Sequence, residues 1–230
     1  MTDLTANRQQ VLSKIENICL DCKRSPHAVA LLAVSKMQSA AAMRTLYAAG
    51  QRIFAENYLQ EALAKQAELA DLDIEWHFIG QIQRNKTRDI AAHFSWVHGV
   101  DRLIIAERLS QQIGEAGQPR LNILLQVNID HEASKGGCLP AALPELVAAI
   151  SQLPHVALRG LMVIPAPDHL DAFTRMQVLF ESVRANHALP DDWDTLSMGM
   201  SGDFAEAIVA GATMVRVGTA LFGARVSAQG

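Results

Sequence analysis

The chain has few cysteines, few aromatic residues and little excess charge, and each shortage excludes a class of protein. Three cysteines among 230 residues are too few for a disulfide framework and fit a reducing cytoplasm. With 20 basic and 24 acidic residues, the sequence predicts no basic surface for nucleic acid. We therefore expect neither a secreted disulfide scaffold nor a nucleic-acid partner.

Membrane and metal signals are equally scarce. No apolar run is long enough to cross a bilayer, and the polar residues 1–10 do not resemble a signal peptide. Cys19 and Cys22 have the spacing of a metal or redox pair, but both fall in a helical pattern with no second ligand pair nearby. We expect a cytoplasmic protein without a metal site. The mild net charge and the lack of an apolar surface stripe favour a monomer.

Apolar strand-like runs alternate instead with amphipathic stretches through most of the chain. The expected strands cover residues 29–35, 52–55, 76–79, 96–100, 121–129, 156–164, 195–198 and 214–217. The expected helices cover residues 4–22, 39–49, 59–69, 85–92, 103–113, 141–152, 170–188 and 204–210. Eight strand-then-helix units predict an α/β protein with a closed parallel (β/α)8 TIM-type barrel. The first helix is an N-terminal addition, and residues 1–230 form a single domain.

In such barrels the active site lies at the carboxyl ends of the strands. Lys36 directly follows the first expected strand, where half-apolar surroundings would lower its pKa and leave a neutral amine able to attack a carbonyl. From position alone, a solvated surface lysine is the more common case. Two segments further along the chain favour the chemical interpretation.

These two segments, residues 198–203 and 216–219, have the composition of phosphate-binding loops. Glycines let the backbone approach an anion, and the hydroxyl of Ser201 can cap a helix and donate to a phosphate oxygen. Gly218 and Thr219 open a second short helix. Either segment alone is more simply an ordinary helix start, with Ser201 or Asp203 as the cap. Together they follow strands seven and eight, where barrels of this kind bind phosphate.

An amine nucleophile beside a phosphate site indicates a phosphorylated aldehyde held as a Schiff base, and pyridoxal 5'-phosphate (PLP) is the obvious candidate. Arg216, facing inward from the last strand, would then meet the pyridine nitrogen and keep it unprotonated, because two adjacent positive charges repel. An ion pair between Arg216 and a carboxylate such as Glu56 is an equally good alternative. Asn57 is placed to donate to the cofactor's phenolic oxygen.

Other polar or soft side chains near the strand ends have a simpler interpretation. His77 could lie beneath the ring, but a satisfied core histidine is the commoner case. Met162 and Met198 could pack against the ring, with core filling as the default. Lys135 follows the fifth strand and offers a second amine, although such lysines are usually only solvated.

Taken together, the motifs resemble the pyridoxal phosphate homeostasis protein family, which has the alanine racemase N-terminal-like barrel. The matching stretches are residues 33–36, 56–58, 76–80, 159–162, 165–167, 196–201 and 214–219. The chain departs from the family's pattern at Met37-Gln38-Ser39, where Thr-Lys-Pro is usual. It also departs at Ala55 in place of glycine, at Gly202 in place of an acidic residue, and at residues 81–84.

The resemblance implies a barrel with PLP bound covalently to Lys36 and with Arg216 facing the ring nitrogen. It implies phosphate contacts from Ser201, Gly202, Gly218 and Thr219. It also implies a protein that is not an enzyme. Such a protein buffers PLP or passes it to PLP-dependent apo-enzymes, and so affects vitamin B6 and amino-acid homeostasis.

Two catalytic alternatives remain open at this point. An amino-acid racemase needs a second acid–base group, typically a tyrosine from an added C-terminal domain. The chain ends soon after the eighth expected strand, and its tyrosines, Tyr47 and Tyr58, come early. An aldolase would use Lys36 and the phosphate loops, but it lacks a convincing acid near the lysine. We therefore favour the carrier.

Overall fold

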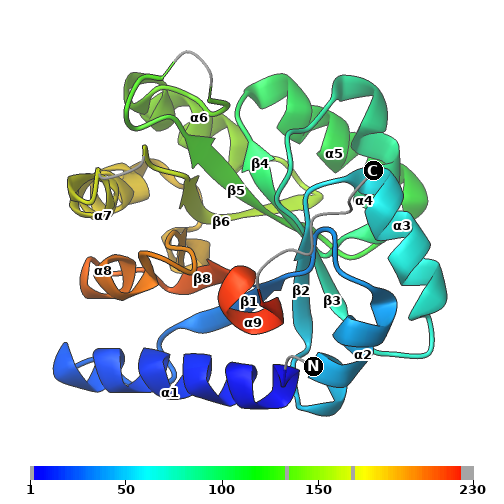
Figure 1. Ribbon diagram of the computed structural model, residues 1–230. Coiled ribbons are helices and arrows are strands. Elements are labelled where there is room, and N and C mark those ends of the chain that lie inside the picture. Colours follow the sequence, from blue (N-terminus) through cyan, green and yellow to red (C-terminus); the bar gives the residue numbers. More distant parts are fainter. Residues whose placement is uncertain (1–2, 133–134, 167–168, 224–230) are drawn as a thin grey trace.

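A computed structural model describes residues 3–132, 135–166 and 169–223 of the protein. Eight parallel strands close into a barrel in the order β1 to β8, and β1 pairs with β8 (Figure 1). The strands are β1 (Ala30–Val34), β2 (Ile53–Glu56), β3 (Glu75–Phe78), β4 (Trp96–Val100), β5 (Leu121–Val127), β6 (Val156–Val163), β7 (Thr195–Ser197) and β8 (Met214–Val217). The predicted (β/α)8 barrel is therefore confirmed.

Helices surround the barrel, and α1 precedes its first strand (Figure 1). The α-helices are α1 (Leu4–Asp21), α2 (Ala40–Ala48), α3 (Leu59–Glu68), α4 (Thr87–His93), α5 (Leu103–Ala116), α6 (Leu143–Ile150), α7 (Asp171–Val183), α8 (Phe204–Val209) and α9 (Thr219–Phe222). Short 3-10 turns are η1 (Arg84–Lys86), η2 (Pro140–Ala142), η3 (Arg184–Asn186) and η4 (Pro190–Asp192).

The extra helix α1 lies beside the last helices of the barrel, α8 and α9. Its N-cap Asp3 accepts a hydrogen bond from the backbone of Ala6 at 2.9 Å. Its buried residues Val11, Ile15 and Cys19 recur every four positions, which places them on one face. The helix contacts α2, α8 and α9. Because α9 is short, α1 provides much of the helical cover beside β1 and β8.

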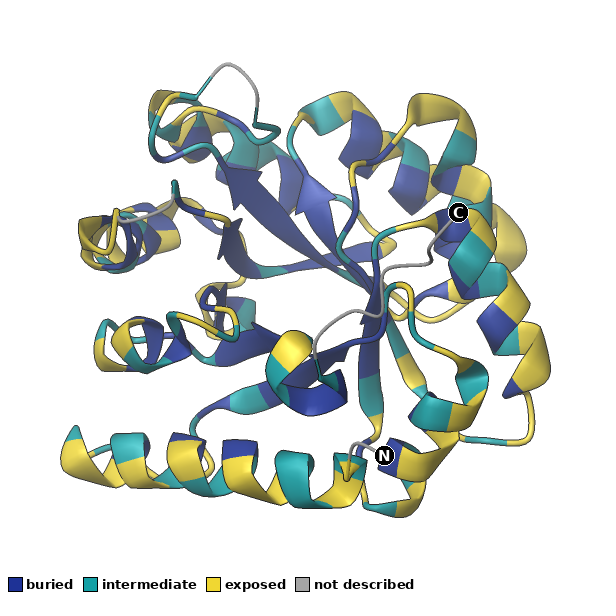
Figure 2. Ribbon diagram, in the orientation of Figure 1, coloured by how far each residue is buried: buried dark blue, intermediate teal, exposed yellow. Residues whose placement is uncertain are grey.

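The interior has two layers, as Figure 2 shows by the dark strands inside helices that are exposed on their outer faces. One large apolar cluster lies between helices and strands. Two small clusters contain buried residues from strands alone and fill the barrel itself: Leu32, Val34, Ala55 and Met214, and separately Trp96, Leu124 and Met162. Between them the barrel interior is polar, with His77, His98, Ser197 and Arg216 all buried.

One helix differs clearly from the sequence expectation. The predicted helix over residues 170–188 ends at Val183, and η3 follows. His187 has an extended backbone, and its Nε2 lies 2.8 Å from the carbonyl oxygen of Leu158. This bond to a distant strand fixes the end of the helix, so a local pattern cannot reveal it. Pro167, part of one motif used for the family resemblance, lies outside the described residues.

Candidate functional site

A cavity of about 250 Å³ opens at the carboxyl ends of the strands. Among the described residues, its lining comes from the ends of β1, β2, β3, β6, β7 and β8 and the loops that follow them: Val34, Lys36, Gln38, Asn57, Ile79, Ile164, Met200, Ser201, Gly202, Arg216, Gly218, Thr219 and Gly223. Seven of the eight residues predicted for the site, all except Met198, are on this list. Residues almost two hundred positions apart thus share one cavity.

Met198 is the exception. Its side chain is fully buried in the apolar layer between strands and helices. The preceding residue, Ser197, faces the barrel interior, where its hydroxyl contacts Arg216. Because successive side chains of a strand point to opposite faces, Met198 faces the helices. Met162 fills the barrel with Trp96 and Leu124. Both methionines therefore fill the apolar core and do not line the cavity.

Lys36 is half-buried in a turn that begins where β1 ends. The turn is fixed by two polar side chains of α3, the buried Lys65 and the partly buried Glu61. Lys65 Nζ donates to the carbonyl oxygen of Ser35 at 2.6 Å, and Glu61 Oε1 accepts from the backbone N–H of Met37 at 2.5 Å. Met37 has φ near +60°, a left-handed conformation that a non-glycine residue adopts only when its surroundings hold it there. The backbone on both sides of Lys36 is therefore anchored.

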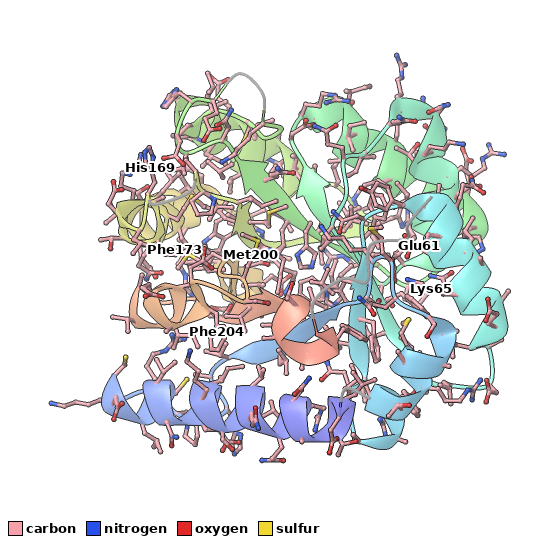
Figure 3. The ribbon with its side chains drawn as sticks, in the orientation of Figure 1. Glu61, Lys65, His169, Phe173, Met200 and Phe204 are labelled. Atoms are coloured by element: carbon pink, nitrogen blue, oxygen red, sulfur yellow. The ribbon has the colours of Figure 1, made fainter. Side chains whose placement is uncertain are left out.

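The anchor is an ion-pair cluster on α3 and β2. Lys65 Nζ lies 2.8 Å from Glu56 Oε1 and 2.6 Å from Glu61 Oε1, and Figure 3 shows Glu61 and Lys65 side by side on α3. Ser35 Oγ also donates to Glu56 Oε1, at 2.6 Å. Burial raises the pKa of Glu56, against the hydrogen bonds from Lys65 and Ser35. We call Ser35, Glu56, Glu61 and Lys65 the turn clamp.

Arg216 enters the cavity floor from β8 and is itself buried. Its Nη1 donates to the carbonyl oxygen and the hydroxyl of Ser197 at 2.7 and 2.9 Å, and Nη2 donates to the carbonyl oxygen of Val163 at 2.7 Å. Burial lowers the pKa of Arg216 to about 10, although the charge of Asp203 acts in the opposite direction. The guanidinium remains charged at neutral pH and is held by uncharged oxygens.

The alternative of an Arg216–Glu56 ion pair is wrong, because Glu56 is committed to Lys65 and Ser35. No carboxylate among the described residues lies within salt-bridge distance of Arg216. A buried cation without a contacting anion is costly. The cavity beside it is the natural place for an electron-rich ligand atom.

The two loops expected to hold phosphate lie together at one edge of the cavity. Ser201 does not cap α8, as the sequence had suggested; its Oγ accepts from the backbone N–H of Ala220 in α9 at 3.2 Å. This bond joins the loop after β7 to the turn after β8. Asp203 Oδ1 accepts from the N–H of Met200 at 2.6 Å and orders the first loop. The hydroxyl hydrogens of Ser201 and Thr219 can then be directed at an anion.

The glycines of these loops differ in what they require. A Cβ at Gly218 would come within 3.3 Å of the carbonyl oxygen of Val34, whereas a Cβ at Gly202 would meet nothing within 4 Å. A side chain at Gly218 would therefore fit poorly against β1. Gly202 leaves open space at the exposed rim of the cavity.

Of the remaining candidate residues, one lines the cavity and the others do not. Asn57 lines the cavity, and its Oδ1 is buried with no hydrogen-bond partner among the described residues. Tyr58 is 58% exposed and does not line the cavity. Lys135 lies 2.9 Å from Glu132 in an ion pair. His77 is fully buried in the barrel interior and does not line the cavity.

Sequence reasoning missed the turn clamp, although one local signal pointed to it. Glu61 and Lys65 have the four-residue spacing that brings opposite charges together on a helix. Lys65 nevertheless lies on the buried face of α3, which a charged residue seldom occupies without a partner. The apolar walls from Ile79, Ile164 and Met200 gave no comparable signal.

Within the described ranges, no group of three or more His, Cys, Asp or Glu side chains is placed to hold a metal ion. Over the same ranges, no helix is both long and apolar enough to cross a membrane.

Comparison with known proteins places the chain in a family. The sequence model described as alanine racemase, N-terminal domain, matches residues 14–226. The pyridoxal phosphate homeostasis protein of Pseudomonas aeruginosa is 54% identical over 231 residues, covering 98% of this chain and 97% of that protein. Its counterpart from Escherichia coli is 47% identical over 233 residues, covering 98% of each.

Solved structures agree with these sequence matches. PipY of Synechococcus elongatus, solved without PLP, is 42% identical with a TM-score of 0.81 and covers 91% of this chain and 100% of its own. The same protein with PLP bound is 43% identical with a TM-score of 0.73 and the same coverage. Alanine racemase from Corynebacterium glutamicum shares only the fold, at 17% identity, a TM-score of 0.63, and coverage of 95% of this chain and 62% of its own. The chain belongs to the pyridoxal phosphate homeostasis protein family and carries its alanine racemase N-terminal barrel.

Proposed function

We propose that this protein binds PLP covalently through Lys36 and serves PLP homeostasis, without turning over an amino-acid substrate. The observation that carries the proposal is the cavity itself, which combines an anchored lysine, a buried arginine and two hydroxyl-bearing loops. The names of its relatives and the PLP-bound structure of PipY support the same ligand.

The residues present fit this cofactor. When bound, PLP supplies an aldehyde that reacts with amines and a ring that withdraws electrons. Lys36 provides the amine, and Ser201, Gly202, Gly218 and Thr219 surround the place for the phosphate. Asn57 has a buried Oδ1 without a hydrogen-bond partner among the described residues. Its side-chain amide can turn to present either its oxygen or its NH₂ group to a polar substituent of the ring.

Arg216 is the residue that favours binding over catalysis. A guanidinium facing the pyridine nitrogen disfavours protonation of that nitrogen, because two adjacent positive charges repel. An unprotonated ring withdraws electrons less strongly. Arg216 therefore stabilises a bound cofactor while weakening its power to activate an amino acid.

The titratable groups of the cavity point in the same direction. Among the described lining residues, only Lys36 and Arg216 carry a titratable side chain. A racemase needs a second acid–base group on the opposite face of the substrate. Tyr58 is directed to solvent and His77 is buried below the floor, so neither supplies that group from the cavity wall.

The proposal extends to the protein's surroundings. We infer a cytoplasmic monomer that buffers PLP or releases it to PLP-dependent apo-enzymes. All three cysteines, Cys19, Cys22 and Cys138, are free thiols, which suits a reducing compartment. Sedimentation velocity of the purified protein tests the monomer, and a concentration-dependent dimer would contradict it.

Two experiments test the central claim. Borohydride reduction followed by mass spectrometry should show a PLP adduct in the native chain and in Lys14→Gln, an exposed lysine on α1, but not in Lys36→Ala. An adduct at normal level in Lys36→Ala would refute the assignment of the lysine.

The second experiment incubates the PLP-loaded protein with L- and D-alanine and follows chirality over hours. We expect no interconversion. Turnover that disappears in Lys36→Ala would instead show a catalyst.

A further inference from the structure

A line of hydrogen-bonded side chains crosses the barrel interior and ends at Arg216. Glu75 Oε1 lies 2.9 Å from His77 Nε2, and His77 Nδ1 lies 2.9 Å from His98 Nε2. His98 Nδ1 lies 3.2 Å from Ser197 Oγ, which accepts from Arg216 Nη1 at 2.9 Å. The line uses residues of β3, β4, β7 and β8. We call it the interior chain.

The interior chain joins opposite ends of the barrel. Glu75 is the first residue of β3, so it lies at the amino end of the strands, and its side chain is 45% exposed. Arg216 lines the cavity at the carboxyl end. The three side chains between them are fully buried. The one solvent-accessible group of the interior chain at the amino end is therefore a carboxylate.

The carboxylate end and the neutrality of the two rings together fix the direction of every hydrogen bond. Burial favours the neutral form of both His77 and His98, and a carboxylate can only accept, so His77 donates from Nε2 to Glu75 and its Nδ1 carries no hydrogen. That Nδ1 accepts from Nε2 of His98, and the unprotonated Nδ1 of His98 accepts the hydroxyl hydrogen of Ser197. Ser197 in turn accepts from the guanidinium of Arg216, which can only donate. Both neutral imidazoles therefore carry their hydrogen on Nε2.

Electrostatics agrees with this assignment. Burial lowers the pKa of His77, against the hydrogen bond to Glu75. Burial also lowers the pKa of His98; the charge of Arg216 acts in the same direction, and so would a proton on His77. The hydrogen bond from His77 lowers the pKa of Glu75. Neutral rings between a carboxylate and a guanidinium are thus the favoured state.

The same directions exclude a proton path into the cavity. Moving a proton along such a line reverses each hydrogen bond in turn, and Arg216 cannot accept one. What the interior chain can do is orient and polarise, since aligned hydrogen bonds strengthen one another in a low-dielectric interior. It holds Nη1 of Arg216 in place and places a negative charge at its far end.

We propose that His77 and His98 are positioning residues for the cofactor site, and that with Ser197 they couple Arg216 to Glu75 at the opposite end of the barrel. This inference rests on the proposed function, because Arg216 acts on the ring nitrogen of bound PLP. Loss of the carboxylate or of either imidazole should let the guanidinium reorient. The affinity for PLP and the absorbance of the bound cofactor should then change.

The first test needs no cofactor. Nitrogen-15 NMR of histidine-labelled protein at neutral pH should show His77 and His98 as neutral rings, each with a protonated Nε2 and an unprotonated Nδ1. The single variants His77→Gln and His98→Gln assign the signals. A charged ring, or an Nδ1–H tautomer at either position, would overturn the directions derived above.

The second test substitutes Glu75, which lies at the opposite end of the barrel from the cavity. Glu75→Gln keeps an acceptor oxygen and lies at a partly exposed position, so the fold should tolerate it; Glu107→Gln, at an exposed glutamate of α5, is the matched control. Glu75→Gln should weaken PLP binding by about two- to tenfold, as expected for coupled members of one network, and should shift the pH profile of the bound cofactor's absorbance. The control should do neither.

A graded series at His98 distinguishes positioning from mere filling. His98→Phe removes both hydrogen bonds and should change affinity and absorbance most. His98→Gln retains one donor and one acceptor and should restore part of both. If Glu75→Gln and both His98 variants bind PLP as the native chain does, the inference is wrong. If the native chain itself fails to bind PLP, the proposed function and the cofactor role both fall, whereas the NMR experiment still decides the hydrogen-bond directions.

Discussion

Two buried cations flank the candidate site, and the structure treats them in opposite ways. Lys65 is surrounded by two carboxylates, Glu56 and Glu61, at 2.8 and 2.6 Å. Arg216 is held by two carbonyl oxygens and one hydroxyl, at 2.7 to 2.9 Å. One charge is neutralised where it lies, and the other is held in position without an anion in contact.

The difference separates a structural role from a functional one. Lys65 donates to three oxygens, those of Ser35, Glu56 and Glu61, so its charge serves the turn that carries Lys36. Arg216 keeps its charge directed at an open cavity, where burial makes an uncompensated cation costly. A binding site is the ordinary reason to retain such a residue, because the ligand completes its environment. Besides the charge of Asp203, the fold links Arg216 to a second carboxylate, Glu75, through the interior chain.

The largest expected effect comes from breaking the compensated pair. Lys65→Met leaves the buried Glu56 carboxylate without its cation, and the free energy of unfolding should fall by about 3–5 kcal/mol. Urea denaturation of the cofactor-free protein measures it. The double variant Lys65→Met with Glu56→Leu should recover much of the loss. A single variant as stable as the native chain would show that the turn clamp contributes little.

Removing the uncompensated cation should cost less. Arg216→Met deprives the oxygens of Val163 and Ser197 of their donor, at about 1–3 kcal/mol, but it also relieves the burial of a charge. Its loss of stability should be smaller than that of Lys65→Met, and its loss of PLP affinity should be larger. The reverse order in either measurement would contradict the division of roles.

The histidines of the interior chain predict a stability that depends on pH. Because burial lowers the pKa of both His77 and His98, the unfolded chain binds their protons first. Stability should therefore be full above about pH 6.5 and should fall below it, by up to about 1.4 kcal/mol per pH unit for each ring. Urea denaturation at several pH values measures this slope, which His98→Gln should reduce.

Asp130 governs how the stability depends on pH under more acidic conditions. Burial alone would raise the pKa of Asp130, but hydrogen bonds from Ala166, Arg175 and His169 prevail and lower it to about 2. Its contribution is complete above about pH 4 and is lost as the pH falls towards 2. Asp130 therefore leaves the slope between pH 6.5 and 4 to other groups. A slope there that persists unchanged in His98→Gln would contradict our assignment to His98.

The smallest effects concern the two phosphate loops, whose hydroxyl groups contact neither Lys65 nor Arg216. Ser201→Ala and Thr219→Val each remove one hydroxyl donor, worth about 0.5–1.5 kcal/mol, so each should weaken PLP binding by about two- to tenfold. Ser182→Ala, on the exposed surface of α7, is the control. Equilibrium titration with PLP measures the change. Unchanged affinity in both variants would remove these loops from the site.

Much of this arrangement followed from local sequence. The alternation of apolar runs and amphipathic stretches identified the barrel, and the position of Lys36, Ser201 and Thr219 after their strands placed them at one end. The partner of Arg216 did not follow. Its candidate Glu56 is the last residue of β2, at the end of the barrel that bears the site, but only the packing of α3 against that strand shows that Lys65 binds its carboxylate.

The sequence by itself determined the strand order, the end of the barrel that bears the site and the residue types gathered there, because these depend on periodicity and on the direction of parallel strands. Tertiary structure alone decided which charges meet. Glu56 pairs with Lys65. Arg216 donates only to neutral oxygens, and Glu75 is linked to Arg216 through His77, His98 and Ser197. Such pairings join residues of different strands and helices. They depend on which side chains are buried side by side, and a local sequence pattern does not contain that information.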